Sequence, residues 1–134
     1  LRPGHRPRHT LTPALARFDD GRTLAWGAMG GDGQPQTLAA VFTRFARFGR
    51  DLQAAITAPR WLLGRTWGEH STSLKLERRF DAHLCDELRI AGHPLELVDD
   101  FDDRMGHAGA ICAHPLGVLE GACDPRADGT VAAL

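Results

Sequence analysis

The sequence is poor in the residue types that most often carry catalysis or mark a chain for modification. It has no asparagine and therefore no N-glycosylation acceptor. Lys75 is the single lysine, which disfavours Schiff-base chemistry unless that residue is buried. The two serines, Ser71 and Ser73, lie in no G-x-S-x-G pattern, and the three cysteines form no C-x-x-C pair. These absences argue against serine hydrolases, zinc ribbons and thioredoxin-type proteins.

Long apolar runs are absent too. No segment approaches the roughly 20 apolar residues that a membrane-spanning helix needs, and no signal-peptide pattern opens the chain. The compartment is therefore left open between cytoplasm and periplasm. The first residue is Leu1, so we expect a processed chain or a piece of a longer protein. With 134 residues, 43% hydrophobic and 25% charged, the composition predicts a single globular domain over residues 1–134.

Charge is distributed unevenly along the chain. Residues 1–65 contain ten Arg and four Asp, whereas residues 66–134 contain six Lys and Arg and thirteen Asp and Glu. The positive half would suit an anionic substrate or a developing oxyanion. The favoured alternative is that the two halves pair with each other or with a missing chain. The net charge of −1 and the lack of interleaved basic and aromatic residues disfavour nucleic-acid binding.

Periodic patterns predict a mixture of strands and helices in the first part of the chain. Segments 11–18 and 23–29 are expected to form a hairpin around the turn 19–21. Pro35 suits the first turn of a helix. Apolar residues then recur at helical spacing as one stripe: Leu38, Val41, Phe42, Phe45 and Phe48.

Further elements are expected in the remainder. Asp51 and Asp81 are predicted to cap two helices, the second with Leu84, Leu88 and Ala91 facing inward. Strands are expected over 73–78, 93–98, 108–113 and 118–122, and irregular structure over 60–71. This mixture of hairpins and helices favours a layered α+β architecture over a parallel βαβ array.

The pair Gly30-Gly31 stands between an expected strand and an expected helix. Glycines permit unusual φ angles and let backbone N–H groups point at an oxygen that gains negative charge. Phosphate binding is disfavoured, because Asp32 would repel it and the pattern G-x-x-x-x-G-K-[ST] is absent. On the residues alone, a tight turn without any ligand is the favoured alternative. His9 and Thr10, at the start of the first strand, could hold a substrate carboxylate or simply be exposed.

Other clusters have structural interpretations. His107 and His114 flank Cys112, but their spacing matches no familiar ligand set, so no metal site is expected. Cys112 and Cys123 could face each other across a hairpin, although buried free thiols are favoured. The acidic segment 99–103 lacks the calcium-loop spacing and is expected to be solvated. Asp124-Pro125-Arg126 is predicted to be a turn held by an Asp–Arg contact.

Several segments, in order, resemble one family. The string Gly30-Gly31-Asp32-Gly33-Gln34-Pro35-Gln36-Thr37 resembles the small-subunit motif of the γ-glutamyltranspeptidase family. Other segments that resemble the same family are Arg6-Pro7-Arg8-His9-Thr10-Leu11-Thr12-Pro13, Ala58-Pro59-Arg60, Met105-Gly106-His107-Ala108, Leu119-Glu120-Gly121-Ala122 and Asp124-Pro125-Arg126. The resemblance covers nearly the whole chain and identifies it as the C-terminal part of a small subunit.

The resemblance implies a fold and a chemistry. The fold would be an αββα four-layer sandwich of the N-terminal-nucleophile hydrolase type, present here as a C-terminal portion. Family members cleave their own precursor, and the new N-terminal Thr of the small subunit becomes the nucleophile, with its own α-amine as base. They cleave γ-glutamyl amides such as glutathione and pass the glutamyl group to water or an amino acid, without cofactor or metal. No Thr-Thr occurs here, so the nucleophile would lie outside this chain.

The resemblance also implies roles for individual residues. Gly30 and Gly31 would donate the oxyanion-hole N–H groups. Thr10 and His9, where many transpeptidases have Ser-Ser, would fix the polar end of the acyl group. Asp32 would orient the turn or contact a substrate amine. The large subunit and the rest of the small subunit would be partners, and the isolated chain is expected to be inactive.

Two alternatives stay open. One is a cephalosporin-acylase-like amidohydrolase, which differs in its acyl group. The other is a non-catalytic binding or scaffold module of the same fold. A Thr that follows a self-cleavage site upstream would favour an enzyme, and its absence would favour the module.

Overall fold

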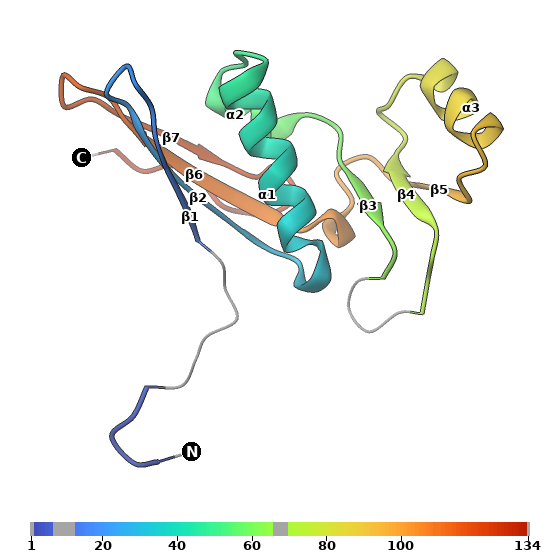
Figure 1. Cartoon of the computed structure of the whole chain (residues 1–134), viewed down its shortest axis with the longest axis horizontal. Helices are drawn as coiled ribbons and strands as arrows, with labels where there is room; N and C mark the ends of the chain where they lie inside the picture. Colours follow the sequence, from blue (N-terminus) through green and yellow to red (C-terminus); the bar gives the residue numbers. More distant parts are fainter. Residues whose placement is uncertain (1, 7–12, 66–69, 134) are drawn as a thin grey trace.

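The computed structural model describes residues 2–6, 13–65 and 70–133. Its larger sheet has four antiparallel strands in the order β1-β2-β6-β7. These strands are β1 (Ala14–Arg17), β2 (Thr23–Met29), β6 (His107–Ala113) and β7 (Leu119–Cys123). The two hairpins thus come from opposite ends of the chain and pair through β2 and β6 in the centre (Figure 1).

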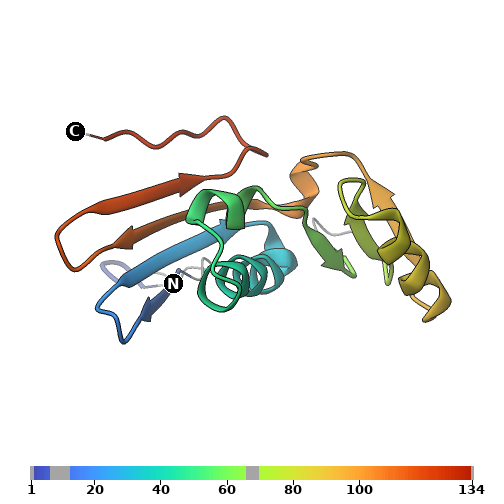
Figure 2. The same cartoon turned by 90° about the horizontal axis from the view of Figure 1, so that it is seen from above.

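Two helices cover one face of this sheet. They are α1 (Gln34–Phe42), which continues into a π-helical turn (Thr43–Arg47), and α2 (Leu52–Thr57). The main core lies between these helices and the sheet (Figures 1 and 2). Its buried members are Leu24, Val41, Phe45, Leu52, Ala55, Ile56, Ala108, Ala110, Cys112 and Ala122. Trp26 joins it by stacking on Phe42, with ring centroids 5.0 Å apart, and by donating its indole N–H to the carbonyl of Leu38.

A second, smaller sheet lies beyond one end of the first (Figure 1). It has the order β3-β4-β5, from β3 (Trp61–Leu63), β4 (Leu74–Glu77) and β5 (Leu95–Val98). The pair β3–β4 is antiparallel, whereas β4 and β5 are parallel and connected through α3 (Ala82–Ile90). The architecture is therefore mixed α+β, with a single parallel strand pair among the described residues.

Local sequence signals explain where most elements begin. Pro35 occupies the first turn of α1, where no intrahelical N–H bond is lost. Asp51 caps α2 by accepting a hydrogen bond from the Ala54 N–H at 2.8 Å, and Asp81 caps α3 through the N–H groups of His83 and Leu84. These predictions are confirmed, as are the hairpin β1–β2 and the hairpin β6–β7.

Three expectations about elements are wrong. The segment 60–71 contains β3, a strand of three residues that is too short to show an alternating pattern. Phe48 is 70% exposed, because the π-helical turn rotates the chain and takes this residue off the apolar stripe. On α3 the buried side chain is Cys85, while Leu84 is 38% exposed, Ala91 is exposed, and Leu88 alone of the three predicted residues is half-buried.

Buried charged side chains connect the two sheets. Glu77 of β4 accepts hydrogen bonds from Arg126 at 2.6 and 2.7 Å, and Arg126 also pairs with Asp124 at 3.0 Å. Asp124 in turn pairs with Arg60, which directly precedes β3. All four side chains are almost fully buried. The predicted Asp124–Arg126 contact is therefore confirmed, and the Arg60–Asp124 pair joins the positive half of the chain to the negative half.

Among the described residues, no helix has the length and apolar character that crossing a membrane requires. Three thiols are free, two of them buried (Cys85 and Cys112) and one partly exposed (Cys123). Cys112 and Cys123 are not cross-strand partners, since Cys112 opposes Glu120 and Cys123 opposes Gly109.

Candidate active site

The turn Gly30-Gly31 connects the end of β2 to the start of α1. Gly30 has φ 144° and Gly31 has φ 53°. Residues with a side chain rarely adopt such positive φ angles, because their Cβ atom would clash with the backbone. A short 3₁₀ turn (Gly31–Gly33) follows, in which the Gly33 N–H donates to the Gly30 carbonyl at 2.9 Å. The turn therefore feeds directly into the N-terminus of a helix, where the backbone dipoles favour negative charge.

The turn packs against the start of β6 without any intervening side chain. A Cβ on Gly30 would lie 3.1 Å from the Gly106 Cα, and one on Gly106 would lie 2.2 Å from the Met29 carbonyl oxygen. Real Cβ atoms essentially never show the second distance, and the first is tighter than most real Cβ contacts, so a Cβ on Gly30 would push Gly106 away by a few tenths of an ångström. Glycine at 30 and at 106 is thus required by close contact as well as by positive φ, and the turn has little room to move.

The rest of the motif fixes the turn from the helix side. Gln36 forms a two-way hydrogen bond with Leu63 of β3, accepting its N–H at 2.8 Å and donating to its carbonyl at 3.1 Å. Thr37 donates its hydroxyl to the Met105 carbonyl at 3.2 Å. Asp32 pairs with Arg65 at 3.0 Å on the surface. The helix that carries the turn is therefore tied to the smaller sheet and to the residues just before β6.

Arg60 supports the glycine turn indirectly, through Gly106, which contacts Gly30. Its guanidinium donates to the Gly106 carbonyl at 2.7 Å and to the Met105 carbonyl at 3.3 Å, while pairing with Asp124. Burial lowers the pKa of Arg60 to about 10, against the opposing effect of Asp124. The side chain consequently stays charged at neutral pH. Asp124 also accepts the Ala108 N–H at 2.7 Å, which fixes the strand just beyond Gly106.

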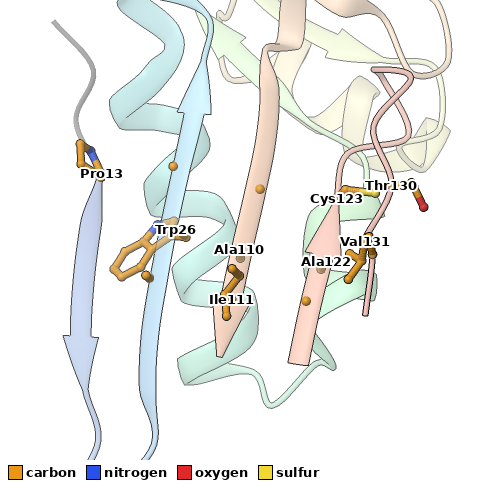
Figure 3. Close-up of a pocket in the computed structure, with 13 residues that line it drawn as sticks. Pro13, Trp26, Ala110, Ile111, Ala122, Cys123, Thr130 and Val131 are labelled. Atoms are coloured by element: carbon orange, nitrogen blue, oxygen red, sulfur yellow. The ribbon is translucent and has the colours of Figure 1, made fainter. Parts of the chain in front are cut away.

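The face of the larger sheet opposite α1 and α2 is largely uncovered. Alternation along β2, β6 and β7 places Ala25, Gly27, Gly109, Ile111 and Gly121 on this face, which we call the bare face. Figure 3 shows it with the helices behind the strands. Ile111 is 55% exposed there. Its glycines leave room for another backbone to approach closely.

The C-terminal segment covers part of this surface. Val131 lies against β7, where a Cβ on Gly121 would be 2.7 Å from the Val131 Cγ1. Pro13, Thr130 and Val131 border a shallow apolar groove on the bare face (Figure 3). The side chains around it offer no cluster of acids or bases.

The predicted substrate-binding residues have different outcomes. His9 and Thr10 lie outside the described residues. Asp32 lies beside the glycine turn and is exposed, and its carboxylate is paired with Arg65. Sequence reasoning missed Arg60, Glu77 and Asp124 as a network, because no spacing signal joins residues so far apart in the chain.

Lys75 is the lysine whose burial was the condition for Schiff-base chemistry, and it is buried. Its Nζ donates to the Gly64 carbonyl at 3.0 Å and to the hydroxyls of Ser71 and Ser73 at 3.0 and 3.3 Å. A carboxylate oxygen of Glu96 lies 3.6 Å from the same Nζ. These contacts make Lys75 a structural hydrogen-bond donor in the smaller sheet.

The chain matches a known protein family over its whole length. The family model for gamma-glutamyltranspeptidase matches residues 1–134. The chain belongs to the gamma-glutamyltranspeptidase family. Solved gamma-glutamyltranspeptidases share its fold, so the chain is a portion of the αββα sandwich of N-terminal-nucleophile hydrolases.

Two curated relatives are named as proenzymes. The oxamate amidohydrolase proenzyme of Klebsiella pneumoniae is 58% identical over 132 residues, covering 98% of this chain and 25% of the relative. The glutathione hydrolase-like YwrD proenzyme of Bacillus subtilis is 42% identical over 134 residues, covering 100% of this chain and 26% of the relative. The chain thus spans about a quarter of the length of these relatives.

A solved acylase has the same fold. The cephalosporin acylase of Bacillus halodurans matches with a TM-score of 0.72 and 34% identity, covering 82% of this chain and 20% of that protein. The proteins that match this chain therefore have names that give quite different acyl groups.

Proposed function

We propose that the protein containing this chain hydrolyses a small amide by N-terminal-nucleophile catalysis, and that this chain supplies its oxyanion hole. The observation that carries the proposal is the glycine turn at the N-terminus of α1. Its positive φ angles, its contact with Gly106 and its support by Arg60 fix the peptide groups of Gly30 and Gly31 before any substrate arrives. Donors fixed in advance are what electrostatic stabilisation of an oxyanion requires.

The reaction follows the chemistry of the family. The hydroxyl oxygen of an N-terminal Thr outside this chain attacks the amide carbonyl carbon, and the α-amine of that Thr takes the hydroxyl proton. The carbonyl oxygen becomes an oxyanion, which the N–H groups of Gly30 and Gly31 stabilise. The intermediate then expels the amine, which receives the proton, and leaves an acyl-enzyme ester. Water, or an acceptor amine, releases the acyl group.

The bare face provides the docking surface for the remainder of the precursor. In a four-layer sandwich the inner faces of two sheets pack on each other, about 10 Å apart. The apolar side chains and glycines of the bare face suit that packing, and Ile111 would be covered by it. The large subunit and the rest of the small subunit are the proposed partners. Alone, the chain would be inactive, because it contains the oxyanion hole without the nucleophile.

Oxamate is the first substrate to test. The 58% identical relative is named for oxamate, whereas the 42% identical one is named as glutathione hydrolase-like. His9-Thr10 stands where many transpeptidases have Ser-Ser, and this difference supports an acyl group other than glutamate. Asp32 is proposed to keep the turn oriented through Arg65 or to contact a substrate amine. A γ-glutamyl amide is the second candidate, since the whole chain matches the transpeptidase family model.

The test is to express the complete gene product and determine the intact mass and N-terminal sequence of each chain. We expect two chains, the smaller beginning with Thr and containing these 134 residues. The processed protein is then assayed with oxamate, a γ-glutamyl anilide and an acyl β-lactam. Release of ammonia from oxamate would support both the proposed chemistry and the proposed substrate. Turnover of the γ-glutamyl anilide or the acyl β-lactam instead would support the chemistry and replace oxamate as the substrate. A single uncleaved chain that turns over none of these substrates would overturn the proposal of an enzyme and favour a non-catalytic binding module.

A further inference from the structure

Three potential metal ligands meet on the β6–β7 hairpin. The Sγ of Cys112, an imidazole nitrogen of His114 and a carboxylate oxygen of Glu120 all lie within 4.8 Å of one another. Cys112 and Glu120 are cross-strand partners, and His114 follows Cys112 by two residues. The hairpin therefore brings all three side chains to the same face. The sequence spacing of Cys112 and His114 did not indicate this set, because Glu120 comes from the neighbouring strand.

The arrangement has the chemistry of a zinc site. Thiolate, imidazole and carboxylate are all zinc ligands, and tetrahedral zinc holds its ligand atoms roughly 3.5 Å apart. The Nε2 of His114 is already 3.0 Å from a carboxylate oxygen of Glu120, so a small adjustment around the ion suffices. The other carboxylate oxygen accepts the Leu52 N–H at 3.3 Å, which orients it as outer hydrogen bonds orient metal ligands.

Charge and access also suit a cation. Glu120 supplies one negative charge, and Cys112 supplies a second when a metal ion displaces its thiol proton, whereas Asp20 in the adjacent β1–β2 turn is paired with Arg22 at 2.7 Å. The side chains of His114 and Glu120 are 33% and 36% exposed, whereas Cys112 is buried behind them. An ion can therefore enter from solvent past His114 and Glu120, and solvent can fill the fourth position.

We propose that Cys112, His114 and Glu120 form a binding site for a divalent transition-metal ion, with zinc as the preferred ion. Calcium and magnesium are disfavoured because they prefer oxygen ligands alone. The site is independent of the proposed catalysis: Cys112 pairs with Leu24 at one end of β2, whereas the glycine turn follows Met29 at the other end. A bound ion would tie the β6–β7 hairpin to the start of α2 through Glu120 and Leu52.

Cobalt is the probe for this site. Metal-free full-length protein is titrated with Co²⁺, followed by Zn²⁺. We expect a near-ultraviolet sulfur-to-cobalt charge-transfer band together with intense visible bands of tetrahedral Co²⁺, all lost when Zn²⁺ displaces the cobalt. Absence of a charge-transfer band at saturating Co²⁺ would overturn the proposal.

Variants assign the ligands. Cys112→Ser should remove the charge-transfer band, while Cys123→Ser, which alters a thiol on the opposite face of β7, should keep it. His114→Gln and Glu120→Gln change partly exposed groups and should keep the fold and weaken Co²⁺ binding by about tenfold or more. They keep the test decisive even if Cys112→Ser does not fold. Unchanged affinity in both variants, or loss of the band in Cys123→Ser, would overturn the site.

Discussion

At the scale of residues, the candidate site depends most on Arg60. This side chain donates hydrogen bonds to the carbonyl groups of Met105 and Gly106, the latter of which contacts the glycine turn, and its charge is balanced by Asp124. Buried ion pairs contribute little net stability compared with an apolar core, but removing one partner leaves the other charge without compensation. The network is therefore more important for holding a geometry than for overall stability.

Replacing Arg60 with Met should be strongly destabilising. Arg60→Met leaves two buried carbonyl groups without their donor and takes one cation away from Asp124. We expect a loss of about 3–5 kcal/mol in the free energy of unfolding, measured by urea denaturation of the processed protein. Arg65→Met is the control, because the exposed Arg65–Asp32 pair should contribute no more than about 1 kcal/mol. Equal losses in the two variants would contradict the role assigned to Arg60.

At the scale of elements, the short 3₁₀ turn before β6 (Asp103–Met105) positions Gly106 against the glycine turn. Asp102 caps it by accepting the Arg104 N–H at 2.9 Å, and the Arg104 guanidinium donates to the same carboxylate at 2.7 Å. These hydrogen bonds to Arg104 lower the pKa of Asp102 below its ordinary value of 3.8. Folding thus favours the ionised form of Asp102.

The contribution of Asp102 should accordingly depend on pH. A lowered folded-state pKa stabilises the protein fully above the unfolded pKa, and this stabilisation disappears as the pH falls through the folded value. Asp102→Ala should cost about 1 kcal/mol at neutral pH, and the difference from the unmodified protein should shrink as the pH falls below 3.8. Urea denaturation at several pH values measures this, with Asp103→Ala as the matched control. A difference that grows on acidification would contradict the assignment.

The sequence predicts those elements whose signals are local. Capping by Asp51 and Asp81, the Pro at the start of α1 and the strand Thr23–Met29 follow from neighbouring residues. The strand β3 does not, because its three residues form only by pairing with β4. Phe48 could not be placed either, since a π-helical turn has no clear sequence signal.

In the candidate site too, only the features that neighbouring residues determine were predictable from the sequence. Gly30-Gly31 was predicted as a strand-to-helix turn, and the structure has the turn at that position. The support that Arg60 gives to Gly106 joins residues distant in sequence, and only folding brings them together. The cluster of Cys112 with Glu120 likewise depends on strand register.

At the scale of the whole molecule, helices cover one side of the larger sheet, and among the described residues the C-terminal segment covers only part of the other side. The bare face is apolar and contains glycines, so it is suited to burial against another sheet. Its strands carry exposed Leu15, Ile111 and Leu119, at 64%, 55% and 69% exposure. Exposed apolar residues that gather on one face of a sheet are typical of an interaction site, as proposed for the bare face.

A charge on the bare face should prevent assembly with the rest of the precursor. Ile111→Asp places a carboxylate where two sheets are proposed to pack, and burying it without a partner is unfavourable. We expect loss of the processed two-chain complex, measured by gel filtration and intact mass. Ile90→Asp is the control, because Ile90 is 87% exposed on α3, away from this face. Normal assembly of the Ile111→Asp protein would contradict the proposed interface.

The most direct test of the oxyanion hole is a kinetic comparison of Gly31→Ala with Gly49→Ala in the processed enzyme. Both glycines have left-handed backbone, with φ 53° and φ 62°, so both variants should lose a similar stability of about 1–2 kcal/mol. Only Gly31→Ala should disturb the N–H groups that are proposed to stabilise the oxyanion. We predict that its kcat falls by about 100-fold with little change in KM, while Gly49→Ala keeps its kcat. A kcat for Gly31→Ala that matches that of Gly49→Ala would contradict the account.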